Sequence, residues 1–386
     1  MSEWRIGAAD AWGTSRVSRL FPQDGRLVHA DLHNHTMLSD GSGDPREAFA
    51  SLRANGLDAA ALTDHTTPGS GISALAGGRR PPVLPQGLDP AGWKLVDELA
   101  EKAHDEGVFV TLRGFEWSHP LFGHVSVWDT GRYTDPVRTP AMRPLYRWLR
   151  RSGGLGGFNH PGKGDPARFG GFRLDRRAPM VSVEMFNKLR DHLLVGAERE
   201  RLSPLVRCLD AGWRVAIAGA TDEHGTDWGA PEHKGRTGLY VTDLSRDGVR
   251  DALVARRAFA SRVKGLRLDA AADGVRMGGV VAAGDGLRVE ADIDGPGWAG
   301  RRVLLQVLST GRPLPRVVAA AEVRVPAPGE PLPALDVDLG GVPGDWLVLR
   351  VADLEQPGDP AAPPGSPFAQ GWAVAYASPW WRSPGP

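Results

Sequence analysis

Histidine and carboxylate residues in this 386-residue sequence gather where short apolar runs end. His33 and His35 end one such run, and Asp222 and His224 end another. Residues i and i+2 of a strand point to the same face, so each pair can present two ligands to one centre. Imidazoles and carboxylates without thiolate suit Mn²⁺, Fe²⁺ or Zn²⁺. The two pairs therefore predict a divalent-metal site.

Further candidate ligands stand at or near the ends of other predicted strands: Asp40, His65, Glu116, His124 and His160. Each of them alone is weak, because surface histidines and turn-forming aspartates are common. Their joint placement at successive strand ends carries the prediction. A carboxylate can bridge two ions, so a set of this size indicates two or three metals, which would activate water as hydroxide.

A second set of residues is expected to support the ligands. Asp64 and Glu184 are predicted to orient ligand side chains. Asp31 lies on the same predicted strand face as His33 and His35. It is either an interior hydrogen-bonded group or a partner that fixes the tautomer of a ligand imidazole.

Two lysines and three aromatic residues adjoin the candidate ligands. Lys163 and Lys188 are two of only six lysines, and either could bind an anionic substrate group or simply face solvent. Trp117, Phe158 and Phe186 could form an apolar substrate pocket, or they could belong to the core.

These residues must be positioned by a scaffold of alternating strands and helices. Apolar runs alternate with helical patterns between residues 28 and 264, with helices expected over 45–56, 93–107, 143–154, 192–212 and 246–257. This alternation predicts repeated βαβ units, in a parallel sheet or a closed barrel. Barrels place their active sites at the C-terminal ends of the strands.

The pattern changes at about residue 265. Segments such as LRVEADID and DWLVLRVAD alternate apolar and polar residues, with Gly and Pro between them. This is typical of an antiparallel β-sandwich. We expect a lead-in segment over 1–27, a metal-binding domain over 28–264 and a β-sandwich domain over 265–386.

Composition narrows the class of protein. Lys+Arg and Asp+Glu both number 46, and this balance argues against a general nucleic-acid or membrane-surface binder. The single cysteine, Cys208, excludes an intrachain disulfide and a cysteine-based zinc site. All 11 histidines fall between His29 and His233. The start of the sequence has no apolar run of a secretory signal, so a cytoplasmic location is expected.

Five ordered segments resemble the successive metal-binding motifs of the PHP (polymerase and histidinol phosphatase) domain superfamily: HADLHNHTMLSDG, LTDH, GFE, NHPGKG and ATDEH. The likeness covers roughly residues 28–260. Three later segments, GHVSV, VEMFN and AVAYASPWW, are similar to the branch that includes the carbaryl-hydrolase-like metallohydrolases.

The resemblance implies a distorted (β/α)₇ TIM-like barrel with a two- or three-metal site at one mouth. It implies ligand roles, with Glu116 bridging two ions, for His33, His35, Asp40, His65, Glu116, His160, Asp222 and His224. The histidine expected between the Glu and NHP motifs would be His124, with His119 as the alternative.

We therefore expect a metal-dependent phosphoesterase in which Glu116, Asp222 and Lys163 have catalytic roles and Lys163 and Lys188 bind the substrate. The substrate should be a small, anionic molecule, and nucleic acid beyond nucleotides or short oligonucleotides is not expected. One alternative is hydrolysis of a carboxylic ester, carbamate or amide on the same metals. Another, of a different class, is a binding or regulatory module that metal ions stabilise.

Overall fold

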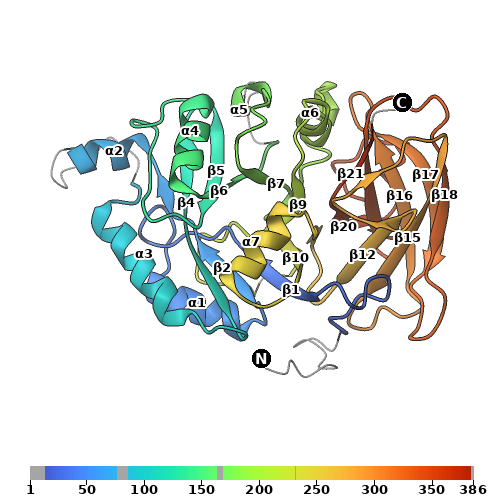
Figure 1. Ribbon diagram of the computed structural model, residues 1–386, viewed down its shortest axis with the longest axis horizontal. Coiled ribbons are helices and arrows are strands. Elements are labelled where there is room, and N and C mark those ends of the chain that lie inside the picture. The colour runs from blue at the N-terminus through green and yellow to red at the C-terminus, as the bar shows by residue number, and fades with distance from the viewer. Residues whose placement is uncertain (1–13, 76–85, 163–167, 231, 384–386) are drawn as a thin grey trace.

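The computed structural model describes residues 14–75, 86–162, 168–230 and 232–383. The fold is mixed α/β, with helices gathered around the N-terminal two-thirds and strands alone at the C-terminal end (Figure 1). The helical elements are α1 (Pro45–Ala54), α2 (Pro68–Leu75), α3 (Pro90–Ala103), α4 (Met142–Ser152), α5 (Arg168–Gly171), the 3₁₀ helix η1 (Ala197–Arg199), α6 (Pro204–Asp210) and α7 (Arg246–Val254).

The first eleven strands, or the loops beside them, carry the candidate ligands. They are β1 (Arg26–Asp31), β2 (Ala59–Leu62), β3 (His65–Thr66), β4 (Val110–His119), β5 (Gly123–Trp128), β6 (Leu155–Phe158), β7 (Met180–Asn187), β8 (Arg190–Asp191), β9 (Ala216–Ala220), β10 (Arg236–Val241) and β11 (Ala258–Ser261).

The later strands are β12 (Arg267–Ala272), β13 (Val275–Arg276), β14 (Val280–Val281), β15 (Gly286–Asp294), β16 (Arg302–Ser309), β17 (Arg316–Arg324), β18 (Ala334–Asp338), β19 (Trp346–Asp353), β20 (Trp372–Ala377) and β21 (Trp380–Arg382).

Local sequence explains where the helices begin and end. The Asp44 carboxylate accepts a hydrogen bond from the backbone N–H of Arg46 before α1, and Asp89 caps α3 in the same way. The helix expected over 192–212 is shorter than predicted. Gly196, with φ 91°, and Pro204, at the first turn of α6, confine helical structure to η1 and α6.

One large mixed sheet runs through most of the molecule. Its strands pair in the order β9–β7–β6–β5–β4–β2–β1–β10–β11–β20–β19–β16–β17. The parallel sheet that we expected is only part of it, because β5 and β10 run antiparallel to their neighbours. The pairing of β11 with β20 carries the sheet from the helix-bearing part into the C-terminal strands.

The strands do not form a closed barrel by backbone pairing. In the described part of the chain, no backbone ladder joins β9 to β10 or β11. Instead, the buried hydroxyl of Thr237 accepts the N–H of Gly219 at 3.1 Å and donates to its carbonyl at 2.8 Å. A Cβ at Gly219 would lie 2.5 Å from the Arg236 carbonyl oxygen. Where the backbones of β9 and β10 come close together, a side-chain hydroxyl thus makes the hydrogen bonds that a backbone ladder would otherwise make.

Thr237→Val should destabilise the fold by about 1–3 kcal/mol, because both backbone groups of Gly219 would lose their buried partner. Urea unfolding followed by circular dichroism measures this change. Thr242→Val is the matched control, since Thr242 is exposed in the turn after β10. Equal stability of the two variants would show that the Thr237 hydroxyl does not stabilise the contact between β9 and β10.

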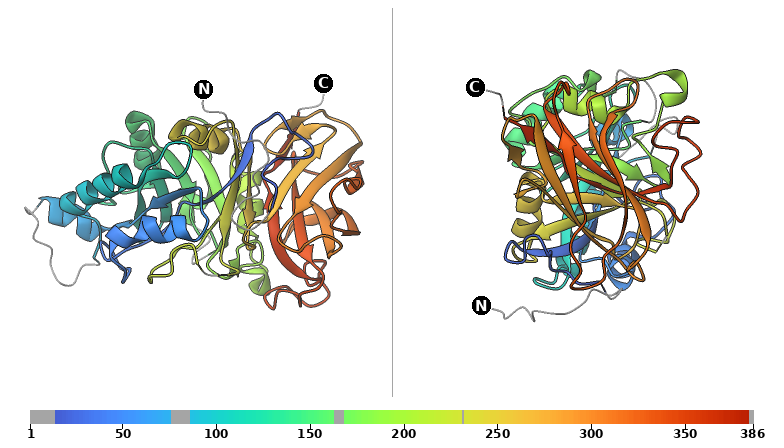
Figure 2. Two further views of the ribbon diagram at one scale, coloured as in Figure 1. Left: turned by 90° about the horizontal axis from the view of Figure 1, so that it is seen from below. Right: turned by 90° about the vertical axis from the view of Figure 1, so that its right-hand side faces the viewer.

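A smaller antiparallel sheet of β13, β12, β15 and β18 shares a hydrophobic core with the C-terminal strands of the large sheet. Leu268 and Val289 of the small sheet contribute to this core together with Leu305 and Leu349 of the large one. Figure 2 shows these strands side by side at the end away from α1 and α3.

A separate core fixes the other side of the ligand-bearing strands. Side chains of β1, β2, β4, β9 and β10 pack there against Val249, Ala252 and Leu253 of α7. Since β1, β2 and β4 run parallel, their C-terminal ends meet at one edge. The candidate ligands therefore leave the strands on the side away from α7.

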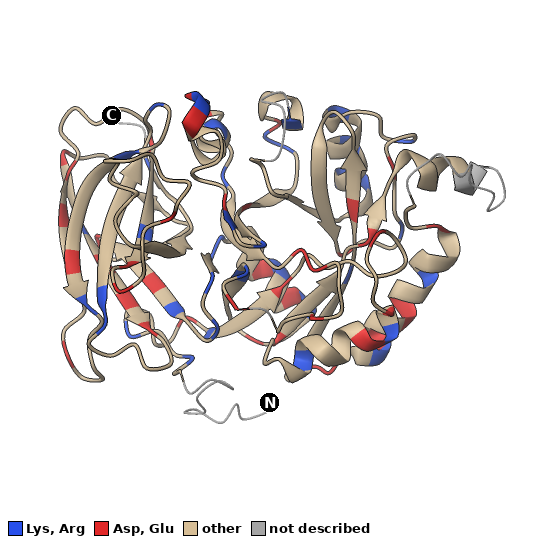
Figure 3. Ribbon diagram, turned by 180° about the vertical axis from the view of Figure 1, so that it is seen from behind, with Lys and Arg blue, Asp and Glu red and all other residues tan. Residues whose placement is uncertain are grey.

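Basic and acidic residues are both scattered over the strands and helices in Figure 3. Cys208 is fully buried in α6. The lead-in segment contacts both parts of the fold, through Arg16 with Asp58 and Arg19 with Asp292. In the stretches that the structure covers, no helix has the length and apolar character needed to cross a membrane.

Candidate metal centre

Nine histidine and carboxylate residues converge at the ends of the strands. They form four overlapping groups, and within each group the ligand atoms lie within 4.8 Å of one another. The groups are His35, Asp40, His65 and His224; His33, Glu116 and His160; His33, His35 and Asp222; and His65, Glu116 and His124. These are the same nine residues that the sequence indicates, and the shared members join them into one cluster.

The centre of the cluster is the fully buried carboxylate of Glu116, which five imidazoles surround. The nitrogen-to-oxygen distances to Glu116 are 2.6 Å from His65, 3.2 Å from His33, 3.2 Å from His160, 3.3 Å from His124 and 3.6 Å from His35. A single buried carboxylate has no structural need for five histidine partners. Its two oxygens face different groups of rings: one faces His33 and His160, and the other faces His35, His65 and His124.

The donor atoms fit a divalent cation. Nε2 of His33 and Nε2 of His35 face each other at 3.1 Å, and Asp222 lies 3.3 Å from His35. In the described structure, Nδ1 of His35 and Nδ1 of His160 are buried without a hydrogen-bond partner. Convergent imidazole nitrogens and carboxylate oxygens in a buried place are suited to divalent metal binding.

The electrostatics of the metal-free cluster favour ligand forms of two central residues. Burial, and after it the positive charge of the nearby His65, lower the pKa of His35 to about 3, so His35 is neutral and one ring nitrogen keeps a free lone pair. Burial alone would raise the pKa of Glu116, but the positive charges of His124, His33 and His65 hold it well below the usual value. Glu116 is therefore a carboxylate.

Backbone contacts bring the first and last ligand pairs together. The N–H of Asp222 donates to the carbonyl of His33 at 3.1 Å, and the N–H of His35 donates to that of Glu223 at 2.9 Å. His160 and Asp222 both have positive φ, 30° and 49°. Such values strain a non-glycine residue, and strain of this kind is concentrated at functional sites.

Glu184 contacts two of the candidate ligand histidines. One of its oxygens lies 2.8 Å from Nδ1 of His33, and the other accepts the backbone N–H of His160 at 2.7 Å and the amide of Asn187 at 2.9 Å. The single carboxylate thus fixes the ring of His33 with Nε2 toward Glu116 and holds the loop that carries His160.

Glu184→Gln should weaken metal binding roughly 10- to 100-fold, the usual effect of removing a partner that orients a ligand. The amide keeps the shape of the side chain but cannot accept all three contacts as a carboxylate does. Mn²⁺ titration calorimetry gives the affinity, and Glu198→Gln, an exposed acid, serves as the control. Unchanged affinity would show that Glu184 only supports the fold.

Asp31 and Asp64 contact the backbone and the hydroxyl groups of segments that carry candidate ligands. Asp31 accepts hydrogen bonds from the hydroxyl and N–H of Thr221, next to Asp222, and its carboxylate lies 3.5 Å from the backbone N–H of His33. Asp64 accepts from Thr36 and from Ser39, next to Asp40. Each of the two carboxylates therefore contacts the residue next to a candidate ligand, Asp222 for Asp31 and Asp40 for Asp64.

Of the two candidate histidines between Glu116 and His160, His124 is the one that lies in the cluster. His119 stacks against Trp117 and Phe122, and its Nδ1 accepts the N–H groups of Leu121 and Phe122. His119 is in none of the four groups of ligand atoms.

Sequence reasoning missed two polar residues of the centre. The amide of Asn159 donates to Glu116 at 2.6 Å and to Ser126 at 2.8 Å. The Ser118 hydroxyl lies 2.6 Å from Nδ1 of His65. Asn159 could have been found, because it stands directly before His160 at a predicted strand end, whereas Ser118 had no such signal.

The lysines and aromatic residues that adjoin the candidate ligands in the sequence differ in where they lie. Nζ of Lys188 lies 3.5 Å from Asp222 and 3.4 Å from Nδ1 of His224, so this lysine is at the cluster. Lys163 lies outside the described residues. Trp117, Phe158 and Phe186 are fully buried in the core, which excludes them from an open pocket.

No protein-family model matches the chain, and no curated protein matches it. Among solved structures, one similar chain is a two-domain protein from Bacteroides vulgatus described as containing a PHP-like metal-dependent phosphoesterase. It is 17% identical, with 94% of this chain and 98% of that chain covered and a TM-score of 0.48.

Two others are similar over about half of this chain. A protein from Bifidobacterium adolescentis described as a metal-dependent phosphoesterase is 15% identical, with 58% and 95% of the two chains covered and a TM-score of 0.34. An amidohydrolase from Chromobacterium violaceum with bound sulfate is 14% identical, with 51% and 87% covered and a TM-score of 0.31.

Proposed function

We propose that the chain is a metal-dependent hydrolase of the PHP type and that it cleaves a phosphoester of a small, anionic substrate. The single observation that carries this proposal is the buried Glu116 carboxylate with five imidazoles within 3.6 Å. Structural metal sites are usually closed sets of four ligands, and this cluster is larger and is exposed on one side.

Two or three divalent ions, Mn²⁺, Fe²⁺ or Zn²⁺, would be held by the nine clustered residues, with Glu116 and His33 each shared between groups. Such ions supply Lewis acidity and lower the pKa of water in a hydrolytic site. Asn159 and Glu184 would keep Glu116 and His33 in place. The alternative of a metal-stabilised binding module predicts metal binding without any turnover.

The exposed side of the cluster marks where the substrate would approach. The side chains of His33, His35 and Glu116 are at most 1% exposed, whereas those of Asp40, His224 and Lys188 are 52%, 28% and 38% exposed. The ammonium group of Lys188 would there contact a substrate oxygen and balance its negative charge. The proposed catalytic role of Glu116 and Asp222 is to hold the metals beneath this face.

The main rival is a hydrolase of carboxylic esters, carbamates or amides on the same metals. Initial rates on p-nitrophenyl phosphate, bis-p-nitrophenyl phosphate, an aryl ester and an aryl carbamate, measured side by side on Mn²⁺-loaded protein, separate the two. Preference for a phosphate supports our proposal. Preference for the ester or carbamate would overturn the substrate class and leave the metal site intact.

Lys188→Gln should lower kcat/KM for p-nitrophenyl phosphate about tenfold or more, because a charged hydrogen bond to the substrate is lost. The aryl ester, which has no charge to balance, should be affected less. Lys94→Gln, on the exposed face of α3, is the control. Equal losses on both substrates would indicate that Lys188 acts on the cluster and does not contact a phosphate.

We also propose a domain description that matches this function. Residues 28–264 would form a distorted (β/α)₇ barrel that stays open between β9 and β10, and residues 265–386 a β-sandwich. Support for the sandwich comes from the core shared by the small sheet and the C-terminal strands of the large one. The pairing of β11 with β20 would fix the two domains to each other.

A further inference from the structure

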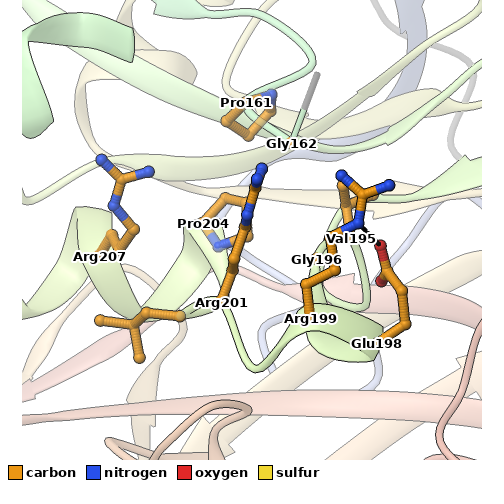
Figure 4. Close-up of a pocket in the computed structure, with 10 residues that line it drawn as sticks. Pro161, Gly162, Val195, Gly196, Glu198, Arg199, Arg201, Pro204 and Arg207 are labelled. Carbon is orange, nitrogen blue, oxygen red and sulfur yellow. Dashed lines mark ion pairs between the residues drawn. The ribbon is translucent and has the colours of Figure 1, made fainter. Parts of the chain in front are cut away.

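A pocket of about 620 Å³ is lined by the two residues that follow His160 and by the segment between β8 and α6 (Figure 4). Pro161 and Gly162 line one side of it. The other side carries three arginines, Arg199, Arg201 and Arg207, whose side chains extend toward Pro161 and Gly162 in this view. We refer to it as the arginine pocket.

The described lining of the arginine pocket carries more basic than acidic side chains. Among the described residues that line it, three are arginines and one, Glu198, is acidic. Arg199 pairs weakly with Glu198, at 3.8 Å and with both side chains more than 60% exposed. In the described part of the chain, Arg201 makes no ion pair. Guanidinium groups that gather in one hollow suit an anion with several oxygens.

The chain holds these arginines in a defined arrangement. The N–H groups of Arg199 and Arg201 both donate to the carbonyl of Gly196 at 3.0 Å, which closes a tight turn. Gly196 has φ 91°, and a Cβ there would lie 3.0 Å from Cβ of Arg201, so glycine is needed at this point. The guanidinium of Arg207 lies 5.6 Å from the ring centre of Phe172.

The pocket begins next to a candidate ligand. Pro161 and Gly162 directly follow His160, so the Cα atoms of His160 and Gly162 are at most about 7.6 Å apart. The backbone N–H of Gly162 donates to Nδ1 of His192 at 3.2 Å, which anchors this wall. The wall formed by Pro161 and Gly162 is thus continuous with the chain segment that carries a candidate ligand.

We propose that the arginine pocket binds a second anionic group of the substrate, a phosphate or carboxylate that is not itself hydrolysed. This proposal rests on the proposed hydrolase function. It deepens that function by assigning the substrate two anionic ends, or one anionic end and a scissile ester, a short distance apart. No residue of the metal cluster is needed for this recognition.

The first test measures anion binding without catalysis. Metal-free protein is titrated with sulfate at constant ionic strength in a calorimeter. We expect one saturable site that weakens about tenfold or more in Arg201→Gln/Arg207→Gln. Arg143→Gln, an exposed arginine on α4, is the matched control, and His33→Ala should keep the site. The single variant Arg201→Gln covers the case in which loss of the half-buried Arg207 unfolds the protein.

The second test measures the effect of a charged tail on turnover by Mn²⁺-loaded protein. One pair of substrates is propane-1,3-diol monophosphate with either a second phosphate or a methoxy group at the far end. The other pair is 4-nitrophenyl glutarate with either a free or a methylated second carboxyl group. In the pair that is hydrolysed, the charged tail should raise kcat/KM roughly tenfold or more through a lower KM. In Arg201→Gln/Arg207→Gln, the ratio of kcat/KM for the charged substrate to that for its uncharged partner should approach one.

The outcomes separate this proposal from the one on which it rests. A ratio near one in the unmodified protein, or a ratio that the double variant leaves unchanged, would overturn the substrate role of the arginine pocket whichever bond is cleaved. Hydrolysis of neither pair, with sulfate binding lost in the double variant, would refute the hydrolase and the substrate role together. Absence of saturable sulfate binding would refute the anion site itself.

Discussion

Glu116→Gln protein is expected to lose bound divalent metal and to fall in turnover by roughly 10³-fold or more. Glu116 is the residue that most of the cluster shares, with imidazoles of His33, His35, His65, His124 and His160 around it. The amide removes the negative charge that these nitrogens and the metal ions face, while it keeps the side-chain volume. Metal content by mass spectrometry and initial rates on p-nitrophenyl phosphate measure both effects.

Glu116→Asp is the informative companion variant. It keeps the charge but withdraws the carboxylate by one methylene, so we expect metal binding between that of the unmodified protein and that of Glu116→Gln. Thermal melting of all three metal-free proteins identifies any variant that fails to fold. Full metal content and rate in a folded Glu116→Gln protein would exclude Glu116 as a ligand.

His33→Ala should abolish turnover and metal binding at the centre to a similar extent. His33 contributes to two of the four groups, one with Glu116 and His160 and one with His35 and Asp222. Its ring is fully buried and held by Glu184, so no nearby side chain can replace it. Rates and metal stoichiometry are measured as for Glu116.

Two neighbouring histidines provide the controls for this variant. His124→Ala should lose metal affinity, because Nδ1 of His124 is 3.3 Å from Glu116. His119→Ala should keep it, since His119 packs on Trp117 and Phe122 outside the cluster. Loss of metal in His119→Ala with retention in His124→Ala would reverse the assignment that the geometry supports.

That the candidate ligands would lie close together could be predicted from the sequence, because these residues follow simple local rules. His33 and His35, or Asp222 and His224, need only the two-residue period of a strand to share a face, and strand ends meet at one edge. The local pattern did not distinguish His119 from His124. Only the antiparallel pairing of β5 with β4, which sets Ser126 opposite Glu116, decides which ring enters the cluster.

Contacts between segments that lie far apart in the sequence could not be predicted from it. The contact between β9 and β10 depends on the hydrogen bonds of Thr237 with Gly219. The continuous sheet depends on the pairing of β11 with β20, more than a hundred residues later. Neither contact leaves a periodic signal in the sequence. The helix expected over 192–212 was wrong in extent, because Gly196 turns the chain in the left-handed region and thereby places the arginines of the pocket.

The site and the arginine pocket together suggest how substrate choice and chemistry are divided. The metal cluster lies at the strand ends, and the arginines lie on the turn between β8 and α6. Variation in that turn would change which substrates bind without changing the ligands. This division follows the general rule that a rigid scaffold carries variable binding loops.

The most direct test of the central claim is metal-dependent hydrolysis by one preparation in three states. The protein is depleted of metal with a chelator, dialysed and reloaded with Mn²⁺, and p-nitrophenyl phosphate turnover is measured at each stage beside His33→Ala. We predict turnover that disappears on depletion, returns with about two or three bound ions per chain and is absent from His33→Ala. Full turnover by the depleted protein, or by His33→Ala, would contradict the proposed metal centre.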